Sequence, residues 1–421
     1  MAKDSKPQGN SYLFPMVVMS VLFFMVGFIT TMNNSLIDFL SGSKWMLSFS
    51  EKQLINTAFF GAYLFSIPLS YLLNKFGYKS SAVLSLFVVG IGFVLTYPAV
   101  GAGYTAFLGS MFVVALGIAL LQIVLNPYVL ALGDPRKAAS RLNLTGFFNS
   151  AATVAAPLFV ALLISGDAVD SNVPAELRPD PTNVRMPFLV IAGIALAMSL
   201  IVYKLRLPDI DDTEGEVGTP QASKSSPYKY PHLLFGAFAI FVYMGVEVGI
   251  PSFLPDRMRA LNLEAVGLFG NELGSTELLA LYWGGLMVGR LIGAFALQRV
   301  PARVALSFCA LSAIVLLGVS LMLDGEISIV LMLLCGLCNS IMWGSIFNLA
   351  SEDLGAHTKR ASGIICTFAI GGAILPPLMG MLQQGFGTAA LTTGTTAALS
   401  CIIVYYLYII LFSLRLSKIR K

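Results

Sequence analysis

Long apolar stretches alternate with short polar ones along almost the whole chain. Most approach or exceed the roughly 20 residues that a helix needs to cross about 30 Å of hydrocarbon. They are apolar on every face and rich in Gly, unlike the alternating strands of a membrane barrel. We predict an all-α membrane protein whose twelve transmembrane helices lie near residues 13–37, 54–73, 81–99, 105–130, 141–164, 187–205, 233–254, 275–298, 303–323, 327–350, 360–383 and 389–413.

The longest polar stretch, LPDIDDTEGEVGTPQASKSSPYKY, separates the sixth and seventh predicted helices and has the composition of a flexible linker. It predicts two six-helix halves, residues 1–206 and 232–421, joined by a linker at 207–231. Arg141 and Pro157 in the first half recur, at the same spacing, as Arg360 and Pro376 in the second. A transporter built from two parallel halves would show such an echo, although Gly- and Ala-rich helices can also resemble each other by chance.

Composition agrees with a membrane protein, and the distribution of charge predicts its orientation in the membrane. Hydrophobic residues make up 57% of the chain, charged residues 11% and mean hydropathy is +0.80. Lys and Arg collect in cytoplasmic loops. With a cytoplasmic N-terminus most of them fall inside the cell, and the outer segments hold only Lys44, Lys52, Arg178, Arg185, Arg257 and Arg259. We therefore predict an inner-membrane protein with both termini and the linker in the cytoplasm, and no nucleic-acid partner, because the net charge of +4 reflects topology.

Polar side chains inside the predicted helices mark the candidate site. Such a group costs free energy unless it faces the bundle interior, a partner or a water-filled cavity. Gln122 and Asn126, for example, lie four residues apart and so share one helix face. Amides can also simply cross-link neighbouring helices. The residues that we assign to substrate binding are Asn33, Asn34, Gln122, Asn126, Asn149, Tyr243, Tyr282, Asn339 and Trp343.

Glu247 is the one carboxylate that this map leaves in mid-membrane, and nothing basic is near it in sequence. An ionised carboxylate in apolar surroundings is costly unless a cation or hydrogen-bond donors meet it. Glu247 is therefore our candidate for carrying a proton, helping to bind a cation or accepting a sugar hydroxyl. We assign it to coupling.

The chemistry of the set favours an uncharged, polyhydroxylated substrate. Amides, hydroxyls and indoles hydrogen-bond to and stack on a sugar ring, in sites that are mostly apolar with a few placed polar groups. An anionic substrate would need a basic residue deep in a span. Only Arg290 is available, and we expect it nearer the cytoplasmic half.

Enzymatic chemistry is disfavoured. The two histidines, His232 and His357, lie at span edges, and no clustered nucleophile, base or metal set is evident. Cys335 and Cys338 have C-x-x-C spacing, but an apolar helix lacks the polar surroundings of a metal or redox pair. We expect no cofactor and no metal site, and as partners a sugar, a coupling cation and the lipid bilayer. We expect a monomer.

Five segments then resemble the fucose permease and glucose/galactose transporter family of the major facilitator superfamily. They are FFMVGFITTMNNSLIDFL (23–40), LLQIVLNPYVLALG (120–133), RLNLTGFFNS (141–150), YMGVEVGIPSFL (243–254) and TKRASGIICTFAIGGAILPPLMG (358–380). NKFGYKS (74–80) also looks like a weakened form of the superfamily's loop motif. The resemblance runs over nearly the whole chain and implies the major facilitator fold: a twelve-helix, alternating-access carrier that moves monosaccharides with a coupling cation.

The resemblance also exposes departures. Proton-coupled fucose permeases carry an Asp in the first helix and a Glu in the fourth, and the matching positions here are Asn34 and Gln122, which cannot titrate. Asn149 matches a family amide implicated in sugar binding, whereas Gly146 stands where the fucose permease has a Gln. Gln122 and Glu247 look like the sodium-coupled glucose/galactose branch, which usually keeps the Asp that this chain lacks.

We therefore predict a secondary transporter for a neutral monosaccharide, a hexose such as glucose, galactose or fucose, coupled to a proton or to sodium. A facilitative carrier, an exporter of another neutral solute such as an amino sugar or a drug, and a membrane sensor that no longer transports remain alternatives.

Overall fold

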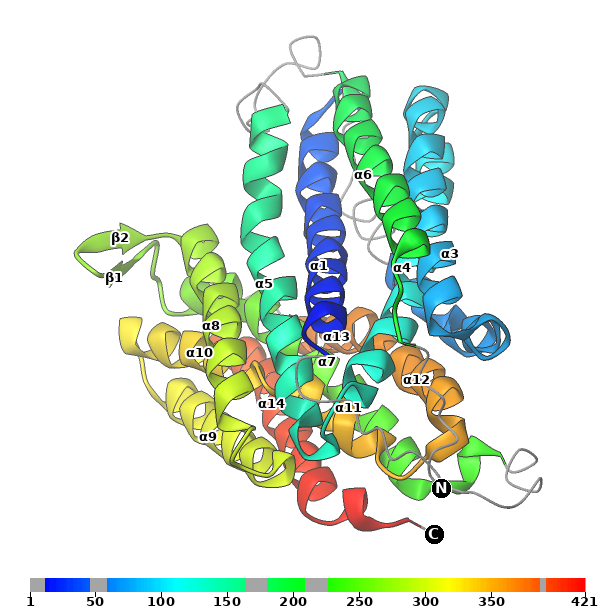
Figure 1. Ribbon diagram of the computed structural model, residues 1–421. Coiled ribbons are helices and arrows are strands. Elements are labelled where there is room, and N and C mark those ends of the chain that lie inside the picture. The colour runs from blue at the N-terminus through cyan, green and yellow to red at the C-terminus, as the bar shows by residue number, and fades with distance from the viewer. Residues whose placement is uncertain (1–11, 46–58, 164–179, 209–225, 387–390, 421) are drawn as a thin grey trace.

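A computed structural model describes residues 12–45, 59–163, 180–208, 226–386 and 391–420, without the side chains of parts of 33–42 and 157–163. Nearly all of this part of the chain is helical (Figure 1). The α-helices are α1 (Leu13–Gly42), α3 (Ser66–Ala102), α4 (Tyr104–Ala131), α5 (Ala138–Leu163), α6 (Arg185–Lys204), α7 (Pro231–Ala260), α8 (Ser275–Ala296), α9 (Ala302–Met322), α10 (Glu326–Asn339), α11 (Met342–Ser351), α12 (Thr358–Thr367), α13 (Gly371–Gly385) and α14 (Leu391–Leu414). Short 3₁₀ turns lie at Ala62–Phe65, Pro135–Lys137, Pro181–Val184, Pro227–Lys229, Gly355–His357, Phe368–Ile370 and Leu416–Lys418.

These helices correspond to the predicted spans, but three segments differ from single straight helices. Spans two and three form one 44-residue helical segment, 59–102, which is broken at Gly77, where φ is 75°. At 1.5 Å per residue this segment is about 66 Å long, enough for two crossings. Span ten consists of α10 and α11, and span eleven consists of α12 and α13 with a 3₁₀ turn between them. Broken helices of this kind occur where backbone lines a cavity.

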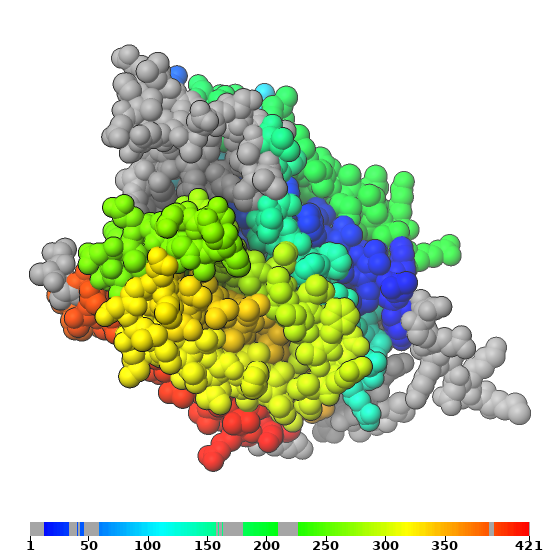
Figure 2. Space-filling view, turned by 90° about the vertical axis from the view of Figure 1, so that its left-hand side faces the viewer, coloured from blue at the N-terminus to red at the C-terminus, as the bar shows by residue number. Residues whose placement is uncertain are grey.

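The structure is that of a multi-pass membrane protein. Ten helical segments in the described residues are long and apolar enough to cross a bilayer, and the 44-residue segment counts once among them. Large apolar side chains are exposed on the outer surface, for example Phe308, Leu311 and Val315 along α9. Figure 2 shows α8, α9 and α10 covering one face of the bundle with α5 and α1 beside them. An apolar outer surface of this kind requires a lipid environment.

A small β-hairpin is the one departure from an all-helical chain among the described residues. Its strands β1 (Val266–Leu268) and β2 (Asn271–Leu273) pair antiparallel between α7 and α8. It projects from the bundle beside α8 (Figure 1). The hairpin is too short to alter the fold class.

Loops and helix ends meet on one side of the bundle, which we name the terminal side. The backbone N–H of His232, at the start of α7, donates to the carbonyl of Ile419, just after α14. The Lys359 ammonium, at the start of α12, lies 4.9 Å from the ring centre of Tyr78, next to the break in α3. The beginnings of α7 and α12, the break in α3 and the end of the chain therefore share this side.

Close approach of helices depends on small residues. A Cβ on Gly27 of α1 would collide with the backbone carbonyl of Asn149 on α5, and α1 packs along α5. A Cβ on Gly363 of α12 would lie 2.5 Å from the Cβ of Ser70 and 2.8 Å from the carbonyl of Ser66, both on α3. Small residues at such contacts let membrane helices touch through their backbones.

Far from the terminal side, a buried arginine ties four helices together. Arg257 of α7 is 2% exposed and donates to Ser328 Oγ of α10 at 3.1 Å. It also donates to the carbonyls of Ser320 and Leu323, at the end of α9, at 3.0 and 2.9 Å, and to Thr396 Oγ1 of α14 at 3.4 Å. A cation among the last carbonyls of α9 is favoured by the free acceptors and the dipole there.

Replacing this arginine should destabilise the bundle. Arg257→Met keeps the length of the side chain but leaves buried acceptors unpaired, each costing about 1–3 kcal/mol. We expect the thermal midpoint of the detergent-solubilised protein to fall by roughly 5 °C or more, measured by fluorescence-detected size exclusion after heating. Arg259→Met is the matched control, because Arg259 is exposed and bonds only to Asp256 in the described residues. Equal midpoints for the two variants would refute the anchoring role.

Candidate functional site

A cavity of about 1360 Å³ lies in the bundle and is lined by helices from both ends of the chain. Its walls come from α1, α4, α5, α7, α8, α11 and α13, with residues 59–63. Most lining side chains are apolar or aromatic, with a few polar groups among them. Its volume exceeds the roughly 300–1,000 Å³ of drug-sized pockets, so water can accompany a small solute.

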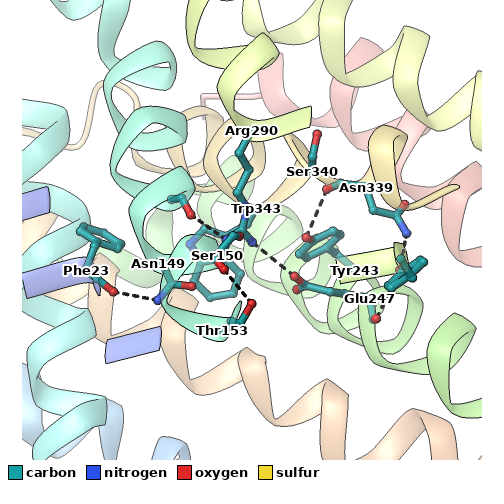
Figure 3. Close-up of polar contacts among 12 residues, drawn as sticks. Phe23, Asn149, Ser150, Thr153, Tyr243, Glu247, Arg290, Asn339, Ser340 and Trp343 are labelled. Atoms are coloured by element: carbon teal, nitrogen blue, oxygen red, sulfur yellow. Dashed lines mark hydrogen bonds and ion pairs between the residues drawn. The ribbon is translucent and has the colours of Figure 1, made fainter. Parts of the chain in front are cut away.

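The floor of the cavity holds an ion pair between two of the predicted spans (Figure 3). Arg290 Nη2 of α8 lies 3.3 Å from Glu247 Oε1 of α7, and both side chains are nearly buried, with exposed fractions of 12% and 11%. Arg290 Nη1 also donates to the carbonyl of Gly146, at 3.1 Å, and to Ser150 Oγ, at 2.8 Å, both on α5. Glu247 has no basic neighbour in the sequence, but the fold pairs it with Arg290 from the next helix.

Three of the predicted binding residues lie behind the cavity wall. Tyr243, Tyr282 and Asn339 are fully buried and do not line the cavity. Asn339 Nδ2 donates to the Tyr282 hydroxyl at 2.9 Å, and the Tyr243 hydroxyl donates to the Asn339 carbonyl at 3.2 Å. Tyr406 of α14 donates to Asn339 Oδ1 at 2.6 Å. This buried network packs against Glu247, because the Tyr282 hydroxyl donates to the Glu247 carbonyl at 3.4 Å. Direct contact of these three side chains with a sugar stays a prediction.

Gln122 and Asn126 share a face of α4, as their spacing predicts, but differ in exposure. Gln122 lines the cavity and donates from Nε2 to the Tyr63 hydroxyl at 2.7 Å. Asn126 is fully buried and donates to the Gln122 carbonyl at 2.8 Å. Its Oδ1 accepts a hydrogen bond of 3.3 Å from the indole of Trp343, which lines the cavity from α11. Asn126 thus holds a cavity residue rather than reaching the cavity itself.

Asn149 lines the cavity and also joins α5 to α1. Its Nδ2 donates to the carbonyl of Phe23 at 3.0 Å (Figure 3). Asn33 and Asn34 lie further along α1, where side chains are outside the described residues. Arg290, Tyr63 and Trp283 line the cavity although they are outside the set assigned to binding from the sequence. A usable signal existed for Arg290: charges inside a bundle usually pair, and Glu247 had no other predicted partner.

The cavity is closed on the terminal side by contacts between helices before residue 204 and helices after 231. The Ser362 hydroxyl of α12 donates to the Ile123 carbonyl of α4 at 2.8 Å, and the Ser140 hydroxyl of α5 donates to the Ala294 carbonyl of α8. Toward the other side the lining continues to Asp256 and Gln384, near the ends of α7 and α13. The described lining therefore extends away from the terminal side.

Comparison with known proteins agrees with this architecture. The family model of the Major Facilitator Superfamily matches residues 19–376. The glucose/galactose transporter of Brucella abortus biovar 1 (strain 9-941) is 40% identical over 380 residues, covering 90% of each chain. The L-fucose-proton symporter of Escherichia coli (strain K12) is 28% identical over 399 residues, covering 90% of this chain and 89% of its own. The crystal structure of the transporter FucP in the outward conformation superposes with a TM-score of 0.80 at 25% identity, covering 95% of this chain and 98% of the other.

Proposed function

The chain belongs to the Major Facilitator Superfamily, and on that premise we propose that it carries a neutral monosaccharide across the inner membrane by alternating access. The composition of the cavity supports this proposal. Indoles of Trp283 and Trp343 can stack on a sugar ring, and the amides of Gln122 and Asn149 can meet its hydroxyls. The relatives named for glucose/galactose and for L-fucose favour a hexose.

The observation that carries the neutral-substrate assignment is the Arg290–Glu247 pair. Among the described lining residues the charged side chains are Glu247, Arg290 and Asp256. The first two compensate each other on the cavity floor, and Asp256 lies beside Arg259 at the mouth. A substrate bearing a net charge would have to compete with this pair. An uncharged solute would not.

For transport we propose that residues 1–206 and 232–421 act as two halves that rock around the cavity, connected by the linker 207–231. Contacts between α5 and α8 and between α12 and α3 would be made and broken in this motion. If both termini are cytoplasmic, the structure corresponds to an outward-open state, as in the FucP structure. All the described lining residues come from one chain, so a monomer would suffice for transport.

We propose that a cation drives uptake and that Glu247 is the coupling residue. It is the buried carboxylate of the cavity floor, and the network of Tyr243, Tyr282 and Asn339 fixes the helix face that presents it. The fucose relative is named as a proton symporter, which favours a proton over sodium. Because Asn34 and Gln122 cannot titrate, this chain would couple through a carboxylate in α7.

The test is uptake of labelled solutes into proteoliposomes of the purified protein. The panel holds glucose, galactose, fucose, an amino sugar and galacturonate, with inward proton and sodium gradients imposed separately. We expect accumulation of at least one hexose under a proton gradient and none of galacturonate. Hexose entry that neither gradient stimulates would indicate a facilitative carrier, preferential galacturonate entry would refute the neutral substrate, and no transport would favour a sensor.

A further inference from the structure

Arg290 contacts α5, which precedes the linker 207–231, and α7, which follows it. Coupling through Glu247 alone would not require the contact with α5. One guanidinium nitrogen meets the Glu247 carboxylate of α7, and the other meets the Gly146 carbonyl and the Ser150 hydroxyl of α5 (Figure 3). We propose that Arg290 is a positioning residue that latches α5 to α7 and α8, and that the charge of Glu247 sets the strength of this latch. The inference rests on the proposed function, because the latch matters only to a carrier whose halves move apart.

Gly146 of α5 leaves space for the Arg290 side chain. A Cβ on Gly146 would lie 3.4 Å from Cδ of Arg290, so the arginine stem already rests against the bare helix backbone. A longer side chain at position 146 would occupy the space of the stem. The rigid fork of a guanidinium can serve two partners on different helices at once, which the single ammonium of a lysine cannot do in the same way.

The charge of Glu247 decides what else the guanidinium can bind. The partners on α5 are both neutral, so among the described residues the Glu247 carboxylate is the counter-ion that contacts Arg290. The ionisable side chains that interact with Glu247 in the described residues are Arg290 and Tyr282 of α8 and Tyr243 of α7. If a proton or a bound cation neutralises Glu247, the guanidinium loses its counter-ion while its side chain is only 12% exposed, which is costly.

Loss of the counter-ion should therefore loosen the α5–α8 contact. The carbonyl and the hydroxyl on α5 cannot by themselves compensate a buried cation, so states in which Arg290 gains water become more favourable. Those states require α5 and α8 to separate at the cavity floor, which lies next to the closed terminal side. Cation binding at Glu247 is in this way converted into a bias toward opening of the terminal side.

The experiment measures that opening directly and without sugar. Spin labels replace the exposed residues Lys137, just before α5, and Arg299, just after α8, in a background lacking the native cysteines, and the distance between them is measured in lipid nanodiscs. Variants are Glu247→Gln, Arg290→Met, the double variant, and Arg290→Lys. Arg185→Met is the control, because Arg185 bonds to the Tyr97 carbonyl away from the cavity.

We expect Glu247→Gln and Arg290→Met each to raise the ratio of long to short distances about threefold or more, the effect of one interhelical hydrogen bond. The decisive result is the double variant: adding Glu247→Gln to Arg290→Met should change nothing further, because the carboxylate acts through the arginine. Additive shifts, or no shift for Arg290→Met in protein that is monodisperse, would overturn the proposal.

The distance distribution of Arg290→Lys should lie between those of wild type and Arg290→Met. A full wild-type distribution for Arg290→Lys would refute the role of the guanidinium fork. Failure of hexose uptake by the wild type would reject the proposed function and leave these distances interpretable.

Discussion

Proteoliposomes containing Glu247→Gln are expected to lose accumulation of sugar against its gradient by about tenfold or more, while exchange of internal for external sugar continues. Glutamine has the shape of a neutral glutamic acid, so the variant resembles the cation-loaded carrier. That form can still cycle with sugar bound, but it has no proton or cation to release. A tenfold loss corresponds to about 1.4 kcal/mol of lost coupling, a modest demand on a buried ion pair.

Asp256→Asn provides the matched control, because Asp256 is on the same helix and lines the same cavity nearer its mouth. Its side chain is 22% exposed and paired with Arg259, so neutralising it should leave accumulation within about twofold of wild type. Accumulation and exchange are measured on the same vesicles, with an imposed proton gradient and without one. Full accumulation by Glu247→Gln would show that coupling does not pass through this carboxylate.

The fold was largely predictable because lipid imposes a strong rule on the chain. Every crossing needs a long apolar helix, and the described helices coincide with the predicted spans. What the pattern could not show was local breaks in the backbone, such as the 3₁₀ turn at Phe368–Ile370 between α12 and α13. Apolar residues occupy the sequence on both sides of such a break, so hydrophobicity does not change there. The hairpin between α7 and α8 was missed because it is short.

The site was less predictable than the fold. The polarity of a residue indicates that it faces away from lipid, but not whether it lines the cavity or is buried between packed helices. Gln122 and Asn126 share a helix face, yet one lines the cavity and the other is fully buried. Asn339 likewise lies behind the wall, with its amide bonded to Tyr282 and Tyr406. The pairing of Arg290 with Glu247 depends on the rotation of α7 and α8 about their own axes. A helix that is apolar on every face has no hydrophobic pattern from which this rotation can be predicted.

A second large effect should arise at the contact between α12 and α3 on the terminal side. Gly363 brings α12 so close to α3 that an added Cβ would lie 2.5 Å from the Cβ of Ser70. Both helices are well packed there, since Ser70, Gly363 and Ser362 are buried. Any side chain at position 363 therefore holds the two helices apart, and overpacking of this kind costs about 1–3 kcal/mol. The cost applies only to the state in which the terminal side is closed, so the equilibrium shifts toward its opening.

Gly363→Leu is accordingly expected to reduce the initial rate of sugar uptake about tenfold or more. It should also make the cavity less accessible to reagents added outside. The measurement is the labelling rate of a single cysteine replacing Ser252, an exposed wall residue, by a membrane-impermeant maleimide in a background without native cysteines. Gly318→Leu on α9 is the control, because a Cβ there meets nothing within 4 Å.

A smaller pair of changes separates gating from misfolding. Gly363→Ala adds only the Cβ and should slow labelling partly, and a second change, Ser70→Gly, removes the Cβ atom that it meets. We expect the double variant to recover part of the wild-type labelling and uptake, because the contact with the Ser70 side chain is removed while the Ser66 carbonyl still lies 2.8 Å from the added Cβ. Wild-type labelling in Gly363→Leu, or no recovery in the double variant, would show that the α12–α3 contact does not close the terminal side.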